Sequence, residues 1–256
     1  KKYIIIIMIN ILITGGAGFI GSNFARFWIN NNPEDNVIVL DRLTYAGNKK
    51  SIDDLILENN NFKFIQGDIC NYELVSSLLY KYKISFVAHL AAESHVDRSI
   101  NSPKAFINSN VNGTFCLLEA FRDYWCFNNK PSNFRFLHVS TDEVYGSLNS
   151  GDKPFNESTP YNPRSPYSAS KASSDHLARA WFETYQLPTI ISNCSNNYGP
   201  YHYPEKLIPL AITNIIRGKS IPIYGNGTNI RDWLFVEDHC RALELILKSD
   251  KIGETF

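Results

Sequence analysis

The feature that most constrains the fold is a set of three glycines that follows an apolar run. Gly15, Gly18 and Gly21 are spaced three residues apart, after the apolar residues 9–14 and before a stretch with helical periodicity. Glycines at this spacing permit a tight turn from a strand into a helix and let the backbone approach a pyrophosphate at the helix N-terminus. Because glycines also serve ordinary turns, the motif indicates a dinucleotide site only together with other residues.

Acidic residues after the next two apolar runs favour NAD over NADP. Asp41 lies 20 residues after Gly21, where a carboxylate accepts hydrogen bonds from the adenosine ribose and repels a 2′-phosphate. Arg42 argues the other way, because an adjacent arginine can accommodate that phosphate. Asp68 follows the third run and is placed either to meet the adenine or to cap the next helix.

Apolar runs and helical patterns alternate over most of the chain. Strands are expected at residues 9–14, 37–40, 62–66, 86–90, 134–140 and 189–193, and helices near residues 18–30, 52–57, 72–81, 105–124 and 167–185. This alternation, with runs that are apolar on both faces, predicts an α/β fold with a doubly wound parallel sheet, the Rossmann arrangement. Ligands bind such sheets at the carboxyl ends of the strands, where we find Thr14, Asp41, Asp68, Ala91, residues 140–143 and Asn193.

Two further motifs bring proton-transfer groups to those strand ends. Tyr167 and Lys171 are four residues apart and share one helix face, which places an ammonium close enough to a phenol to lower its pKa from about 10. We therefore expect Tyr167 to act as a general base near neutral pH. Asp142 and Glu143, which follow Thr141, supply more proton-handling groups than an alcohol oxidation requires. This excess predicts an elimination coupled to hydride transfer.

Charge and cysteine content argue against several other classes of protein. Lysine and arginine together number 25, as do aspartate and glutamate, so no net field favours nucleic acid or anionic lipid. The five cysteines and the six histidines show no metal-binding spacing, so we expect no metal and a cytoplasmic protein with reduced thiols. The apolar start is too short to cross a bilayer and has no cleavage-site pattern, so no membrane association is expected.

The sequence pattern changes after about residue 199, where prolines separate short segments. We therefore expect an NAD-binding domain at residues 1–198, which includes the helix of Tyr167, and the start of a smaller substrate-binding portion at residues 199–256. The chain stops at Phe256 without a capping or polar tail, which is the pattern expected of a truncated portion.

Seven longer stretches carry a resemblance to one enzyme family. They are Thr14-Gly-Gly-Ala-Gly-Phe-Ile-Gly21, Ala91-Ala-Glu-Ser-His-Val-Asp-Arg-Ser-Ile100, Ser140-Thr-Asp-Glu-Val-Tyr-Gly146, Ser165-Pro-Tyr-Ser-Ala-Ser-Lys171, Asn193-Cys-Ser-Asn-Asn-Tyr-Gly-Pro200, Pro204-Glu-Lys-Leu-Ile-Pro209 and Arg231-Asp-Trp-Leu-Phe-Val-Glu-Asp-His239. On these residues, which are distributed over nearly the whole chain, the sequence resembles the dTDP-glucose 4,6-dehydratases, which are extended short-chain dehydrogenase/reductases.

The resemblance implies conversion of dTDP-glucose to dTDP-4-keto-6-deoxyglucose and water, by oxidation at C4, elimination across C5 and C6, and hydride return to C6. NAD is regenerated in each cycle. By the same resemblance, Tyr167 takes the proton of the sugar 4-hydroxyl, Thr141 bonds that hydroxyl, and Lys171 holds Tyr167 and the nicotinamide ribose. Glu143 removes the C5 proton, and Asp142 protonates the departing 6-hydroxyl.

The resemblance also implies two binding sites and a dimer. The NAD site is expected to comprise Gly15, Gly18, Phe19, Ile20, Gly21, Asp41, Asp68, Ile69, Ala91, Ala92, Ser109, Tyr167, Lys171 and Asn193. The nucleotide-sugar site is expected to comprise Ser94, Thr141, Asn196, Lys206, Leu207, Pro222, Tyr224 and Arg231. Helices 105–124 and 167–185 are expected to form a four-helix bundle in a homodimer.

Three alternatives remain open from the sequence. A 4,6-dehydratase that uses UDP-glucose would share every motif, because the contact that tells the two bases apart is not resolved. A nucleotide-sugar 4-epimerase or decarboxylase would share the Tyr167–Lys171 pair and NAD, but it does not need the Asp142–Glu143 pair. A catalytically silent NAD-binding scaffold would be expected to lack Tyr167 or Lys171, and both are present.

Overall fold

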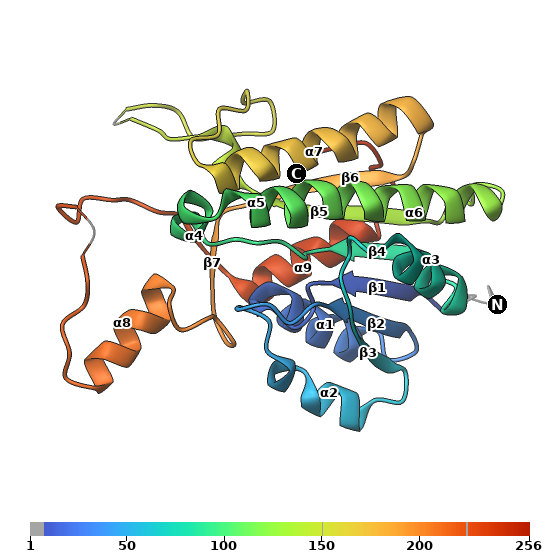
Figure 1. Ribbon diagram of the computed structural model, residues 1–256, viewed down its shortest axis with the longest axis horizontal. Coiled ribbons are helices and arrows are strands. Elements are labelled where there is room, and N and C mark those ends of the chain that lie inside the picture. The colour runs from blue at the N-terminus through green and yellow to red at the C-terminus, as the bar shows by residue number, and fades with distance from the viewer. Residues whose placement is uncertain (1–7, 150, 224) are drawn as a thin grey trace, which may run out of the picture.

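A parallel sheet of six strands lies at the centre of the protein (Figure 1). The computed structural model describes residues 8–149, 151–223 and 225–256. The strands lie in the order β3-β2-β1-β4-β5-β6, and every neighbouring pair is parallel. Their bounds are β1 (Asn10–Thr14), β2 (Asn36–Asp41), β3 (Phe62–Gln66), β4 (Phe86–His89), β5 (Arg135–Thr141) and β6 (Thr189–Cys194). The sheet confirms the predicted fold class.

Helices cover both faces of the sheet because its central strands are apolar on both sides. Successive side chains of a strand point to opposite faces. In β1, Ile11 and Ile13 join the core beneath α1 (Phe19–Asn31), α2 (Asp53–Glu58) and α9 (Val236–Leu247). Leu12 joins the core beneath α3 (Tyr72–Lys81), α6 (Gly113–Phe127) and α7 (Pro166–Tyr185). All three side chains are fully buried, which explains why the middle of β1 is apolar at every position.

The expected helix at residues 105–124 is interrupted by a wider turn. After α4 (Val96–Asn101) and α5 (Pro103–Phe106), the π-helical segment η2 (Ile107–Asn112) leads into α6. Its buried residue Asn110 accepts a hydrogen bond from the Glu93 backbone N–H and donates to the Glu93 carbonyl and to Ser170 Oγ. These bonds tie the π turn to the segment after β4 and to α7. The prediction of one continuous α-helix was therefore wrong at this turn.

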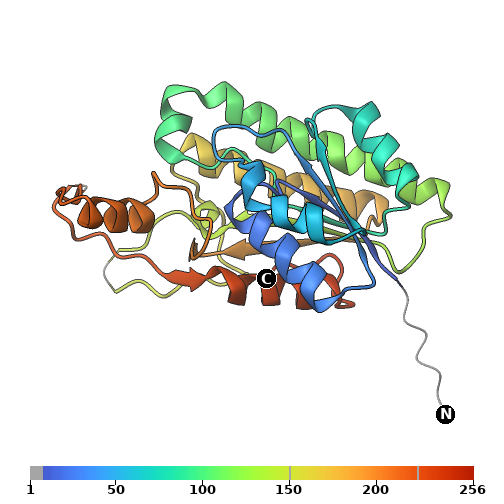
Figure 2. The ribbon, with the colours of Figure 1, turned by 90° about the horizontal axis from the view of Figure 1, so that it is seen from below.

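The last part of the chain contributes to two regions. The two-stranded sheet of β7 (Asn196–Tyr198) and β8 (Trp233–Phe235) and the helix α8 (Leu207–Ile216) stand beside the main sheet (Figure 1). In contrast, α9 runs alongside α1 (Figure 2), and the Gly253 N–H donates to the Thr189 carbonyl of β6. We therefore keep the predicted division after residue 198 as a proposal for residues 199–235 and assign α9 to the packing of the main sheet.

Candidate active site

The predicted glycine turn forms a cradle at the carboxyl end of β1. Gly15 has a φ of +72°, and a Cβ there would lie 2.6 Å from the Ala91 backbone nitrogen. A Cβ at Gly21 would overlap the carbonyl oxygen of Gly15. No side chain caps the N-terminus of α1, so its first N–H groups are left for an anionic group. The cradle thus fits a dinucleotide pyrophosphate.

The close packing at Gly21 leads to a stability prediction. We expect Gly21→Ala to lower the unfolding temperature by roughly 5 to 10 °C, because the new methyl group must push Gly15 out of the turn. Gly18→Ala is the matched control, since a Cβ at Gly18 meets only the Gly15 carbonyl oxygen, at 3.2 Å. Thermal unfolding without added NAD compares the two variants, and equal melting temperatures would contradict the prediction.

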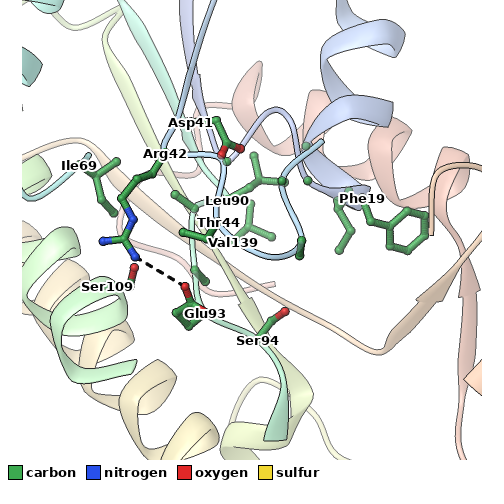
Figure 3. Close-up of a pocket in the computed structure, with 18 of the residues that line it drawn as sticks. Phe19, Asp41, Arg42, Thr44, Ile69, Leu90, Glu93, Ser94, Ser109 and Val139 are labelled. Carbon is green, nitrogen blue, oxygen red and sulfur yellow. Dashed lines mark ion pairs between the residues drawn. The ribbon is translucent and has the colours of Figure 1, made fainter. Parts of the chain in front are cut away.

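Acidic side chains are among those that line the pocket next to this turn, as Figure 3 shows for Asp41 and Glu93. Asp41 ends β2, and its carboxylate accepts hydrogen bonds from the backbone of Ala17 at 3.0 Å and of Leu43 at 2.7 Å. Burial raises the pKa of Asp41. These two bonds leave lone pairs on both oxygens, so Asp41 can still accept bonds from a ribose. Asp41 therefore both shapes the glycine turn and faces the cleft.

Arg42 is held by acidic neighbours. Its Nη1 lies 2.8 Å from Asp68 Oδ2, and its Nη2 lies 3.8 Å from Glu93 Oε1 (Figure 3). Two carboxylates thus balance the charge of the guanidinium, which the sequence analysis considered as a possible ligand for a 2′-phosphate. Because Arg42 is paired in this way, the structure supports NAD over NADP. Asp68 is not the helix cap that was considered for it, because the Asn71 side chain caps α3.

One cleft collects almost all of the predicted cofactor residues. Of the predicted NAD set, Asn193 alone does not line it, because its amide donates to the Thr141 carbonyl and to Asp175. The lining residues that sequence reasoning missed include Tyr45, Glu93, His202 and Tyr203. Glu93 and the pair His202–Tyr203 lie within or next to stretches that carry the family resemblance, which is the signal that could have identified them.

The loop before α8 covers one end of this cleft. The His202 ring stacks on Phe19 with centroids 4.2 Å apart, and Tyr203 meets the edge of Tyr45 at 5.7 Å. Arg98 lies over the Tyr45 ring at 3.8 Å and pairs with Glu205 at 3.2 Å. These contacts bring Lys206 into the lining of the same cleft.

The predicted proton-transfer residues meet at the carboxyl end of β5. Thr141 ends this strand and accepts a hydrogen bond from the Glu143 N–H, which begins the short helical turn η3 (Asp142–Tyr145). Tyr167 lies in the first turn of α7, which is fixed by reciprocal hydrogen bonds between Ser165 and Ser168 and by Pro166. The Thr141 side chain lies close enough to the Tyr167 phenol to lower its pKa. The structure therefore brings the phenol to the two carboxyls.

Burial and like charge raise the pKa values of these groups. Burial raises the pKa of Glu143, and the adjacent Asp142 carboxyl raises it further. The Asp142 pKa is also raised, chiefly by burial. Two acidic groups with raised pKa values in one small volume can divide the roles of proton donor and acceptor.

The expected lowering of the Tyr167 pKa by Lys171 was wrong for this structure. The pKa of Tyr167 lies well above its ordinary value because the ring is buried and Glu143 is nearby. The Lys171 ammonium donates to the Val139 carbonyl at 2.9 Å. Burial lowers the pKa of Lys171, and Asp175 opposes that decrease.

The predicted substrate residues divide into two groups. Ser94 and Lys206 line the cleft, and Thr141 adjoins Tyr167. The remaining described residues lie outside its lining: Asn196 in β7, Leu207 at the start of α8, and Pro222 and Arg231 in the exposed segment before β8. Arg231 is near enough to the carboxyl pair to favour the charged forms of Asp142 and Glu143. The prediction at Tyr224 lies outside the described residues.

The fold and the cleft together define an extended short-chain dehydrogenase/reductase. The family model described as GDP-mannose 4,6 dehydratase matches residues 12–256. A dTDP-glucose 4,6-dehydratase of Salmonella typhimurium is 57% identical over 256 residues, which cover 96% of this chain and 70% of that protein. The chain therefore belongs to the dTDP-glucose 4,6-dehydratase family.

Solved structures also show greater similarity of this chain to a dehydratase than to an epimerase. A dTDP-glucose 4,6-dehydratase of Streptomyces venezuelae, solved with NAD bound, superposes with a TM-score of 0.89 and 46% identity over 97% of this chain and 74% of that one. A UDP-glucuronic acid 4-epimerase of Bacillus cereus superposes with a TM-score of 0.85 but only 30% identity, over 97% and 76% of the two chains. The shared fold extends to epimerases, whereas the sequence is closer to the dehydratase.

Proposed function

We propose that this protein is an NAD-dependent hydro-lyase that converts dTDP-glucose to dTDP-4-keto-6-deoxyglucose and water. The observation that carries the proposal is the turn at the end of β5, which places Asp142 and Glu143 beside the buried Tyr167. An epimerase needs the phenol and NAD, but it has no elimination step that would use two carboxyls. The identity to the Salmonella enzyme, 57%, supports the same conclusion.

We assign the proton transfers to groups around Tyr167. Tyr167, as its phenolate, takes the proton of the sugar 4-hydroxyl, and Thr141, whose side chain lies beside the phenol, orients that hydroxyl. Glu143 then takes the proton at C5, which the new 4-ketone makes acidic. Asp142, whose raised pKa favours its protonated form, gives its proton to the departing 6-hydroxyl.

The cleft residues hold the cofactor in this proposal. When bound, NAD would supply the hydride acceptor for oxidation at C4 and the hydride donor for the return to C6. The cradle of Gly15 and Gly21 receives the pyrophosphate at the N-terminus of α1, and Asp41 binds the adenosine ribose. Lys171, which lines the cleft, holds the nicotinamide ribose. Because the hydride is returned in each cycle, the cofactor need not leave.

Turnover of two nucleotide sugars tests this function. The protein is incubated with dTDP-glucose and UDP-glucose in competition, and the products are weighed by mass spectrometry. We expect a dTDP-linked product that is lighter by one water. A product of unchanged mass with altered sugar configuration would establish an epimerase, and preferred loss of water from UDP-glucose would overturn the choice of nucleotide.

We further propose a homodimer built on α6 and α7, which lie side by side (Figure 1). Phe115 on α6 is 47% exposed and meets the edge of Trp181 on α7, and Tyr185 continues this aromatic surface. We expect Phe115→Glu to convert a dimer into a monomer at micromolar concentration in sedimentation velocity, because it buries a charge in an apolar interface. The control Leu57→Glu on α2, where Leu57 is 85% exposed, should remain dimeric.

The cellular location is the remaining proposal. All five cysteines are unpaired in the described structure, which supports a reducing, cytoplasmic setting. Within the residues that the structure describes, none of the helices has the length and apolar character needed to traverse a membrane.

A further inference from the structure

A carboxylate that the proposed reaction does not use lies beneath the Tyr167–Lys171 pair. Asp175 is on α7, one helical turn beyond Lys171, and it is 1% exposed. Three groups from three different segments donate hydrogen bonds to its Oδ2, and they are Ser140 Oγ at 2.9 Å, Tyr161 OH at 3.0 Å and Asn193 Nδ2 at 3.2 Å. So many donors on one oxygen indicate an ionised carboxylate.

A buried histidine lies between this carboxylate and Lys171. His138 Nε2 lies 3.1 Å from Asp175 Oδ1, 3.1 Å from Ser174 Oγ and 3.5 Å from Lys171 Nζ. The ammonium also donates to the Val139 carbonyl, one residue further along β5. Lys171 is therefore held between β5 and the His138–Asp175 pair, with its end in the lining of the cofactor cleft.

Lys171 is the cation that this carboxylate balances. Burial, together with Lys171, lowers the pKa of His138 to about 4, so its ring is neutral at neutral pH. Burial also lowers the pKa of His89, on β4, well below its ordinary value. Neither imidazole can then compensate a buried negative charge.

Among the neighbouring charged groups, Asp175 has the largest effect on the pKa of Lys171. Burial raises the pKa of Cys194, on β6, to about 12, so this thiol stays protonated. Burial and Asp175 raise the pKa of Tyr161, and burial and Glu143 raise that of Tyr167. Among the titratable groups of the described residues that face Lys171, Asp175 therefore supplies the negative charge.

We propose that Asp175 is a positioning residue, whose carboxylate is the buried counter-ion that keeps the Lys171 ammonium charged and, with His138, directed at the cofactor cleft. The proposal rests on the proposed function only for the role of Lys171 in holding the cofactor. Removal of one buried charge leaves the other without a partner, whereas removal of both removes the conflict. This difference can be measured without any substrate.

The first test is a double-mutant cycle on the full chain. We expect Asp175→Asn and Lys171→Met each to lower the unfolding temperature by roughly 10 °C, and the double variant to be more stable than the sum of the two losses predicts. If Asp175→Asn does not fold alone, the double variant should recover folding. Additive losses, or a double variant that stays unfolded, would overturn the proposal.

The second test follows the charge of Lys171 through NAD affinity. Because a neighbouring anion favours the ammonium, its loss should lower the Lys171 pKa, and NAD affinity should then fall at a lower pH. In Asp175→Asn we expect this alkaline decrease to move down by about 1 to 3 pH units. Asp175→Glu should restore its position. Tyr161→Phe, which removes one donor but keeps the carboxylate charge, should leave it in place.

The affinity test distinguishes a counter-ion role of Asp175 from a role in packing alone. A uniform loss of affinity at every pH in Asp175→Asn, with the alkaline decrease unmoved, would show that Asp175 only fills space. Both tests use unfolding and NAD binding. A failure to dehydrate dTDP-glucose would therefore count against the proposed function and leave the assignment of Asp175 to be judged separately.

Discussion

Tyr167→Phe is expected to abolish the oxidation itself, so that no transient NADH appears when the variant meets dTDP-glucose. Loss of a general base reduces rates by roughly 100- to 10,000-fold. The structure places the phenol near both Thr141 and Glu143, and each of them affects its pKa. Rapid-mixing absorbance at the NADH band measures the transient, and a transient of normal size would remove Tyr167 from its assigned role.

Tyr145→Phe is the matched control for this experiment. Tyr145 is as buried as Tyr167, at 7% and 8% exposure, but it packs against Phe155 and Tyr161 and does not line the cleft. We expect it to form NADH normally. If both variants lost the transient equally, the effect would reflect disturbed packing and not the loss of a base.

Glu143→Gln is expected to separate oxidation from elimination. The C4 oxidation should proceed, because Tyr167 and Thr141 are unchanged, whereas exchange of the C5 proton with deuterated solvent should fall by roughly 100-fold or more. Mass spectrometry of recovered sugar measures the exchange. Undiminished exchange would exclude Glu143 as the base, and Glu157→Gln, in an exposed loop, is the control for loss of an acidic group.

The pH dependence of this exchange follows from the neighbouring carboxyl. Glu143 must be ionised to act as a base, and its raised pKa means that exchange begins to fail at a pH above the ordinary value of about 4.3. Asp142→Asn removes the like charge, so the pKa of Glu143 should decrease and exchange should persist to lower pH. The same variant should lose water elimination, because it lacks the proton donor.

Much of the main sheet could be predicted from the sequence because its strands are buried on both faces. β3 was predicted at its observed bounds, and β1, which contains Ile11, Leu12 and Ile13, within one residue. The glycine turn and Asp41 were predicted because their spacing relative to the strands is a local sequence pattern. Each of these signals is contained in a short stretch of sequence, so no distant contact is needed to interpret it.

Features that depend on distant contacts were not predictable. The spacing of Tyr167 and Lys171 is local, but the pKa of the phenol is set by burial and by Glu143, which comes from another strand end. The His202 ring reaches Phe19 only because the chain returns across the cleft. Asp175 shares the helix of Lys171, yet its role depends on donors from three separate segments.

The π turn before α6 has a consequence for changes in chain length. Each residue of an α-helix advances the side-chain direction by about 100°. A deletion within Ile107–Asn112 that restored regular α-helix would rotate Phe115 away from Trp181, or else swing Ser109 out of the cleft. The π turn therefore allows Phe115 to pack against Trp181 while Ser109 lines the cleft. Losing one amino acid there should therefore do more harm than replacing any of its exposed side chains.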